Sequence, residues 1–496
     1  MNFLRGVACV LLAVALVECT EERETKWHVV GVSHISIQVS NLSSSTYFYT
    51  EILGGKLVDE LSCLEGTSDM EYIRLWTREA AEQIVEDCAV EEVDCDKISP
   101  VSTSWKVYFA SVLFDNMMIQ LVQYESIGQD IEENVTPKSL IQDMAETKIA
   151  FWLEDSVNLT EYAENIEERS QNYGLEKVRF MRPLLLSDNA NFREANKGVR
   201  ELRDEKLKGL SIGYAKGPDG ENIKVIQLVE SSKHSFGKHY CEAKMISSAL
   251  LNTDRCEHSH HGNQSRLNGV NHISIMTADV NSTLEFFINK MGAYFIDDVQ
   301  PSHLQSPSLS KIMVDKLLAH STNGEEVTLE DDDFRSKLLQ MVSSVELNMR
   351  YILLGNIMVE VVFLTGLPPN SGDNFKMFDI MPGSSFSLPG STEVAFMFSK
   401  KRDLENFAAE NGGLVQPSTI TKGPLQGLTS ALMTSPSKRT IRLVHFSHSS
   451  KHHLHSSMRR HGAVHPAFDG LNPWLSEGYY DFCQQFETLG ESSEVE

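Results

Sequence analysis

Hydrophobic and polar positions alternate in two widely separated stretches of the chain that share one motif. Residues 31–40 read GVSHISIQVS, and residues 269–278 read GVNHISIMTA. In both, the isoleucines of HISI alternate with polar side chains, which is the period of a half-buried β-strand. A polar turn with helix-capping residues follows (NLSSS or DVNST), then an aromatic pair, and then a glycine of the kind that ends a helix. The pattern predicts strand, turn, helix and stop, twice.

The repetition extends through most of the chain. Residues 31–54 and 269–292 share nine identities over 24 aligned positions, and residues 114–124 and 354–364 each place a turn asparagine before an apolar strand. The strand–turn–helix pattern recurs at 148–166 and 393–408, and each half closes with a further strand, at 217–230 and 435–447. Four similar units in two pairs indicate an internal-repeat architecture.

These units resemble the βαβββ modules of the vicinal oxygen chelate superfamily, the glyoxalase, bleomycin-resistance and extradiol dioxygenase fold. The resemblance rests on a histidine at the head of the first strand, an aromatic pair on the helix and a closing glycine: His34, Phe48-Tyr49 and Gly54, then His272, Phe286-Phe287 and Gly292. It covers roughly residues 28–447 and implies an α+β fold of tandem paired modules that form two curved-sheet troughs. The expected domains are 24–232 and 268–447, joined by a Cys- and His-bearing linker at 233–267 and followed by a His-rich and acidic tail at 448–496.

The N-terminus has the pattern of a signal peptide over residues 1–19. A charged start precedes the apolar run GVACVLLAVALV, which is too short to span a bilayer, and small residues follow. We therefore expect a secreted glycoprotein. Six cysteines remain after cleavage, an even number that suits disulfides in an oxidising compartment: Cys63, Cys88, Cys95, Cys241, Cys256 and Cys483. Five glycosylation sequons are present, at Asn41, Asn134, Asn158, Asn263 and Asn281.

The charge of the chain restricts its partners. A formal net charge of -25 argues against nucleic acids and anionic membranes, which carry charge of the same sign. No segment after the signal approaches the length of a membrane span. The expected partners are a small-molecule ligand or an extracellular protein.

The resemblance implies a metal in each trough, held by side chains from the first and fourth strands of paired modules. In the first half these positions read His34, Gln120, Lys148 and Lys224. An ammonium group cannot coordinate a cation, so this site is expected to be degenerate. The two lysines could bind a carboxylate or phosphate. Alternatively, both extend to water, or the alignment is one residue out of register.

In the second half the same positions read His272, Glu360, Glu393 and Arg442. One imidazole and two carboxylates suit a single divalent Zn, Fe, Mn or Ni. Arg442 either pairs with Glu393 or offers its fork to an acidic substrate. The dioxygenases that the chain resembles use two histidines and a glutamate, which would need His at position 393 and Glu at position 442. The sequence departs from that set.

Glu360 is the candidate general base of such a centre. It stands inside the apolar run VEVVF, and a buried acid needs a partner. Glu393 follows a turn, where solvated side chains are usual, and His272 has the alternative of a purely structural role. Three functions stay open: a protein that binds a small molecule or partner, a metal-dependent lyase, isomerase or dioxygenase active in the second half, and a structural component of the extracellular matrix.

Overall fold

The computed structural model describes nine stretches of the chain, apart from the single positions 115, 155, 278 and 438: 29–61, 105–126, 147–181, 185–186, 210–228, 266–299, 346–365, 390–419 and 427–447. The expected signal peptide, nearly all of the linker, the tail, the six cysteines and the sequons at Asn134 and Asn263 lie outside these residues. Within the described stretches, no helix is long and apolar enough to cross a membrane.

Four modules of strand, helix and further strands follow one another along the chain. The first contains β1 (Val29–Gln38), α2 (Leu42–Tyr47), the π-helical turn η1 (Phe48–Ile52), β2 (Lys56–Leu61), β3 (Trp105–Phe114) and β4 (Met117–Ser126). The second contains β5 (Lys148–Leu153), α5 (Leu159–Asn172), β6 (Arg179–Phe180), β7 (Leu185–Leu186), β8 (Leu210–Lys216) and β9 (Asn222–Leu228).

The other two modules repeat this order. The third contains β10 (Leu267–Met276), α8 (Val280–Glu285), the π-helical turn η5 (Phe286–Lys290), β11 (Tyr294–Val299), β12 (Glu346–Leu354) and β13 (Ile357–Thr365). The fourth contains β14 (Thr392–Phe398), α11 (Lys401–Glu410), β15 (Gly413–Thr419), β16 (Leu428–Thr434) and β17 (Thr440–Phe446). The α+β class and the paired βαβββ modules expected from the sequence are confirmed.

Local signals in the sequence place the helix ends. Asn41 caps α2 by accepting a hydrogen bond from the Ser44 amide, and Asp279 does the same for α8 with Ser282. Gly54 and Gly292 follow the π-helical turns with φ of 81° and 79°, the left-handed conformation that glycine adopts at little cost. The predicted stops are therefore confirmed in both copies.

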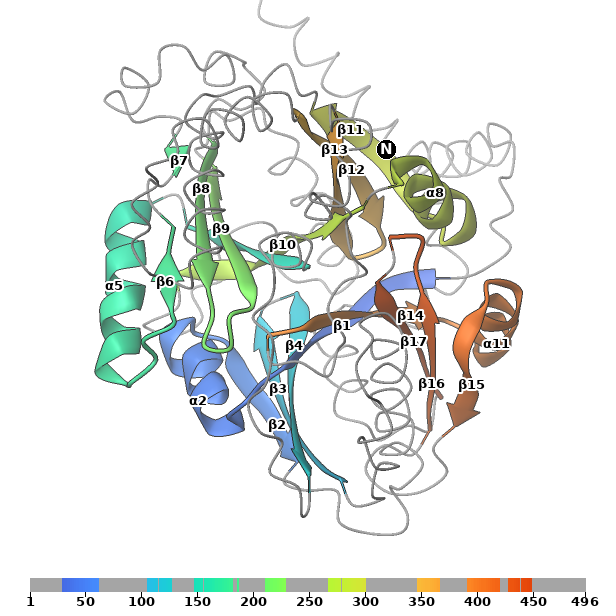
Figure 1. Cartoon of the computed structure of the whole chain (residues 1–496), viewed down its shortest axis with the longest axis horizontal. Helices are drawn as coiled ribbons and strands as arrows, with labels where there is room; N and C mark the ends of the chain where they lie inside the picture. The colour runs from blue at the N-terminus through green and yellow to red at the C-terminus, as the bar shows by residue number, and fades with distance from the viewer. Residues whose placement is uncertain are drawn as a thin grey trace, which may run out of the picture.

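The modules share sheets in a different combination from the one expected. Within the described residues, one sheet has the order β15-β16-β17-β14-β1-β4-β3-β2, which joins the fourth module to the first. The other has the order β11-β12-β13-β10-β5-β9-β8-β6, which joins the third to the second. We call them sheet A and sheet B; in Figure 1 they occupy the lower and upper parts of the molecule. The expected pairing within each half is wrong, because β1 pairs with β14 and β5 with β10.

The two modules within each half meet through their helices instead. Tyr47 at the end of α2 stacks on Tyr173 at the end of α5, with ring centroids 3.6 Å apart. Phe286 of η5 packs edge-on against Phe407 of α11 at 5.9 Å. Figure 1 shows α2 beside α5 on one side of the molecule and α8 with α11 on the other. One apolar core, to which all four modules contribute, fills the space between the helices and the sheets.

Two asparagines brace sheet A against sheet B. Asn356, in the turn between β12 and β13, accepts a hydrogen bond from the Val32 amide and donates one to its carbonyl, both at 2.9 Å. Asn116, in the equivalent turn of the first module, makes the same two bonds with Val270, at 2.9 and 2.8 Å. These are the turn asparagines singled out in the sequence. Val32 and Val270 each lie two residues before a motif histidine, so the braces fix both histidine-bearing strands.

Candidate functional site

The strand register determines which side chains meet at the centre of each sheet. In sheet B, Ser274 of β10 lies opposite Glu360 of β13 on one side and Lys148 of β5 on the other. His272 lies opposite Ala150, which in turn lies opposite Lys224 of β9. Side chains at paired positions share a face of the sheet. The centre of sheet B therefore combines two lysines of the first half with the histidine and glutamate of the second.

Sheet A has the equivalent arrangement with different chemistry. Ser36 of β1 lies opposite Gln120 and Glu393, and His34 lies opposite Ala395, which pairs with Arg442. The eight positions chosen from the sequence are thus central in the two sheets, but they are divided between them differently. Glu393 lies in sheet A, apart from His272 and Glu360 in sheet B, so the expected three-ligand set of the second half is not brought together.

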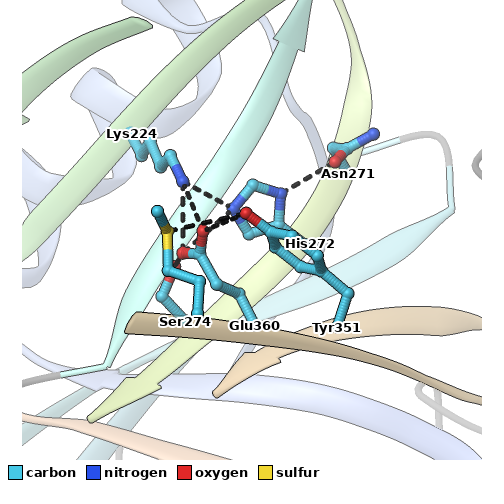
Figure 2. A network of polar contacts seen from close by, with 7 residues as sticks. Lys224, Asn271, His272, Ser274, Tyr351 and Glu360 are labelled. Carbon is cyan, nitrogen blue, oxygen red and sulfur yellow. Dashed lines mark hydrogen bonds and ion pairs between the residues drawn. The ribbon is translucent and has the colours of Figure 1, made fainter. Parts of the chain in front are cut away.

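Lys224 is the hub of the contacts in sheet B (Figure 2). Its Nζ lies 3.0 Å from His272 Nε2, 3.2 Å from Glu360 Oε1 and 3.1 Å from Glu360 Oε2. All three side chains are buried, with 2%, 0% and 3% of their surface exposed. An ammonium group has three hydrogens to donate, and these three acceptors match them. Lys224 neither extends to water nor is available to a ligand anion.

The carboxylate of Glu360 receives two further donors. Ser274 Oγ donates to Oε2, and the Tyr351 hydroxyl donates to Oε1 at 3.4 Å. His272 is held from its other side, where Nδ1 lies 2.8 Å from Asn271 Oδ1. Nδ1–H therefore donates to Asn271 and Nε2 accepts from Lys224, which is the pattern of a neutral imidazole. The partner that an acid in VEVVF requires is a lysine from another module.

The electrostatics of this network fix its protonation state. Burial lowers the pKa of His272 to about 4, and the charge of Lys224 acts in the same direction. Burial raises the pKa of Glu360, but the Lys224 charge outweighs it, assisted by the hydrogen bond from Ser274, so that this pKa lies well below its usual range. Lys224, Glu360 and a neutral His272 together carry no net charge, and Lys148, opposite Ser274, is a further cation at this centre.

The centre of sheet A is also occupied by an ion pair. Arg442 donates from Nε to Glu393 Oε1 at 2.6 Å and from Nη2 to Oε2 at 3.3 Å, while Nη1 donates to Ser430 at 3.0 Å. Both side chains are 1% exposed. Burial raises the pKa of Glu393 against the opposing effect of Arg442. The expectation that Glu393 is a solvated surface residue is wrong, because it lies within β14 at the middle of the sheet.

Neither centre suits the divalent metal that the resemblance implies. In sheet B the ammonium of Lys224 touches both candidate ligands, so a cation already occupies the place where a metal would bind. In sheet A both oxygens of Glu393 face Arg442, which leaves His34 and Gln120. Across the part of the chain that the structure describes, no group of three or more His, Cys, Asp or Glu side chains is arranged to hold a metal. The predicted metal set of the second half is therefore not supported.

Sequence reasoning missed the residues that complete the network, namely Ser274, Tyr351 and Asn271. Ser274 belongs to the repeated motif, and its recurrence as Ser36 indicates that this serine takes part in the contacts of the sheet centre. A second signal was the charge at the chosen positions, since the four of the first half include two lysines and no acid, whereas those of the second half include two acids. Pairing the lysines with the surplus acid of the other half would have suggested the contact between Lys224 and Glu360.

A cluster of apolar and aromatic side chains packs beside the centre of sheet B. It consists of buried side chains with partly buried neighbours: Trp152, Leu210, Ile212, Ile226, Leu228, Tyr351 and Met358, with Tyr214, Ile296 and Met349 against them. Tyr214 lies opposite Lys224 in the β8–β9 ladder, and its ring centroid is 6.0 Å from Lys224 Nζ. Apolar side chains beside a few convergent polar groups are the usual composition of a small-molecule site.

Comparison with known proteins finds similarity in structure only. No protein-family model and no curated protein matches the sequence. A Bacillus subtilis protein assigned as a dioxygenase is 9% identical, with 91% of this chain and 97% of that one covered and a TM-score of 0.42. A glyoxalase I variant from Zea mays is 11% identical, with 84% and 92% covered and a TM-score of 0.39. A glyoxylase/bleomycin resistance protein/dioxygenase domain from Frankia is 17% identical, with 41% and 96% covered and a TM-score of 0.20.

Proposed function

We propose that this chain is a secreted, metal-independent binding protein with the glyoxalase-like fold. Its ligand is an uncharged, largely apolar small molecule that binds to the face of sheet B that carries the apolar and aromatic cluster. The observation that carries the proposal is the position of Lys224. Its ammonium neutralises Glu360 and donates a hydrogen bond to His272, so a cation of the protein stands where a metal would bind and the three side chains together carry no net charge. The signal-like N-terminus and the sequons support secretion.

The same geometry disfavours acid–base catalysis at this centre. A general base works best when its pKa lies near the working pH. The pKa of Glu360 lies well below its usual range, that of His272 is about 4, and that of Tyr351 is raised well above 10.0 by burial and by the charge of Glu360. The pKa of each group lies far from neutral pH, so the role expected of these side chains is to orient a ligand.

The class of ligand follows from the charges. Of the three cations that the sequence offered for anion binding, Lys148, Lys224 and Arg442, the last two are each bonded to a carboxylate. An added carboxylate or phosphate would have to compete with Glu360 or Glu393 for its cation. A neutral molecule with an aromatic or aliphatic body and one or two hydrogen-bonding groups meets no such competition.

The first test is the metal content of the protein secreted from eukaryotic cells, truncated after Ser447 to remove most tail histidines. Elemental analysis for Zn, Fe, Mn and Ni should give far less than one metal per chain. About one tightly held metal per chain that is lost in a His272→Ala/Glu360→Ala variant would overturn the metal-independent proposal.

The second test measures ligand binding with Nile red, an uncharged apolar dye. We expect saturable binding that Tyr214→Ala weakens by about fivefold, because an aromatic contact contributes about 1 kcal/mol. Tyr173→Ala is the matched control, since Tyr173 is 46% exposed and packs on Tyr47 between helices. Equal affinity in the two variants, or no saturable binding by the parent protein, would count against sheet B as the binding face.

A further inference from the structure

The turn between β8 and β9 makes a second polar cluster, away from both sheet centres. It has the sequence GPDGE over residues 217–221 and docks on the first module. Asp219 accepts from the Ser40 amide at 2.9 Å and from the Ser40 hydroxyl through Oδ1, and from Ser45 Oγ at 2.8 Å through Oδ2. Three bonds to one carboxylate fix the tip of the turn at the start of α2.

Glu221 is the buried member of this cluster. It is 0% exposed, as is Tyr49 of η1, whose hydroxyl donates to Glu221 Oε1 at 2.7 Å. The amide of Asp219 donates to Oε2 at 3.0 Å. A methyl group placed at Gly217 would lie 2.0 Å from the Glu221 carboxylate, so the turn closes tightly around this side chain.

The groups that face Glu221 include no described cation. Its own turn presents the acidic Asp219, η1 presents Tyr49, and α2 presents neutral hydroxyls. The segment before β14 contributes Gly390, where an added Cβ would lie 2.4 Å from the Asp219 carbonyl oxygen. Lys216, five residues before Glu221, donates to Asn222 at 2.8 Å, and Lys224, three residues after it, is bonded to Glu360. When ionised, this carboxylate is therefore buried beside a second negative charge.

We propose that the turn at 217–221 is a proton-operated latch between the first and second modules. With a proton on Glu221, the bond to Tyr49 reverses, the phenol oxygen accepts from the carboxyl group, and the turn stays seated. Loss of the proton leaves two neighbouring carboxylates under the turn and favours its release. β9 begins at Asn222 and carries Lys224, so the latch holds the strand that supplies the centre of sheet B.

The direction of the pH effect follows from linkage. Burial, assisted by the charge of Asp219, raises the pKa of Glu221 from 4.5 to about 7. A carboxyl group with a raised folded-state pKa stabilises the fold fully below its unfolded-state value, and this contribution is lost as the pH rises toward the folded-state value. The latch is thus tight in acid and loosens between about pH 4.5 and about pH 7.

The test is amide hydrogen exchange of the full chain, compared below and above this pH range after correction for the intrinsic rate. Peptides covering residues 38–49 and 217–221 should lose about tenfold in protection on the alkaline side, whereas Glu221→Gln should keep the same protection throughout. Glu164→Gln, an exposed change on α5, is the matched control and should behave like the parent. Equal pH profiles in the parent and Glu221→Gln would overturn the latch.

A second variant keeps the proposal testable if Glu221→Gln does not fold. Asp219→Asn retains an oxygen for Ser40 but removes the neighbouring charge, so the transition should move to lower pH. An unshifted transition in Asp219→Asn would assign the pH dependence to other groups.

Discussion

At the level of single residues, Lys224 supplies the positive charge that a metal ion would otherwise bring to His272 and Glu360. It carries a positive charge, lies about 3 Å from each acceptor and is buried. A metal and an ammonium group differ in whether they leave a position free to bind substrate. A metal can offer open positions to substrate oxygens, whereas the three hydrogens of Lys224 are all directed at protein acceptors. The centre is thereby closed to metal-type chemistry.

Lys224→Met should be strongly destabilising, because it leaves the Glu360 carboxylate buried without its cation. We expect a loss of about 3–5 kcal/mol in the free energy of unfolding, measured by denaturant titration. A Lys224→Met/Glu360→Gln double variant removes both charges and should recover much of that loss. A single variant that loses less than about 1 kcal/mol would show that Lys224 is not the counter-ion of Glu360.

The buried histidine gives a pH dependence opposite in sign to that of the latch. Because the pKa of His272 falls from 6.5 to about 4 on folding, the unfolded chain binds the proton first as the pH falls. Stability is lost in acid across this interval, by about 3 kcal/mol at most. The Glu221 effect runs the other way over an overlapping interval, so the parent protein should show a shallow net slope.

The two contributions can be separated by comparing Glu221→Gln with Glu221→Gln/His272→Gln. Thermal or chemical unfolding as a function of pH should give the first variant a clear loss of stability in acid, and the second a flatter curve between about pH 6.5 and about pH 4. The same slope in both would exclude His272 as its source.

At the scale of single elements, one predicted glycosylation site also caps a helix. Asn158 precedes α5, and its Oδ1 accepts from the amides of Thr160 and Glu161 at 2.9 and 3.3 Å. A glycan would attach to the side-chain nitrogen and leave this oxygen in place. Cap and modification are therefore compatible at one residue. Asn41, which caps α2, has the same arrangement.

Asn158→Ala and Thr160→Ala should separate these two roles. Both remove the sequon, and both should lack the glycan by mass spectrometry of the secreted protein. Only Asn158→Ala removes the cap, so it should be less stable than Thr160→Ala by about 1 kcal/mol in chemical unfolding. Equal stability would show that the cap contributes nothing to α5.

Much at this scale was predictable because the signals are local. Alternation in HISI predicts a strand, Asn41 a helix start, and Gly54 a helix end, and each depends only on neighbouring residues. The caps show the limit of such reasoning. Asp279, rather than the serine or asparagine after it, caps α8, because several adjacent residues could serve and packing selects among them.

At the scale of the whole molecule, the sheets make the two halves of the chain depend on each other. β1 pairs with β14 over residues 29–37 and 392–398, and β10 pairs with β5 over residues 267–274 and 148–153. A half expressed alone would expose these strands as unpaired edges, which favour aggregation. The boundaries expected at 24–232 and 268–447 therefore stay predictions about the sequence repeat, while the sheets themselves cross between the halves.

Residues 24–232 and 268–447 should not fold when expressed separately but should assemble when co-expressed. Circular dichroism and size-exclusion chromatography would distinguish a folded 1:1 complex from aggregates. Two soluble, cooperatively unfolding halves, each stable without the other, would contradict the sheet order.

Local patterns in the sequence were enough to predict the modules and the face of each strand on which the motif residues lie, because a two-residue period and helix caps depend on neighbouring residues. The same patterns predicted central positions in the sheets for His34, Gln120, Lys148, Lys224, His272, Glu360, Glu393 and Arg442. Which of these side chains meet depends on how distant strands pair in the folded chain. A strand pattern specifies which side is buried but not which distant strand lies beside it. The pairing of the second module with the third put Lys224 against Glu360, and that contact replaced a predicted metal site with an internal ion pair.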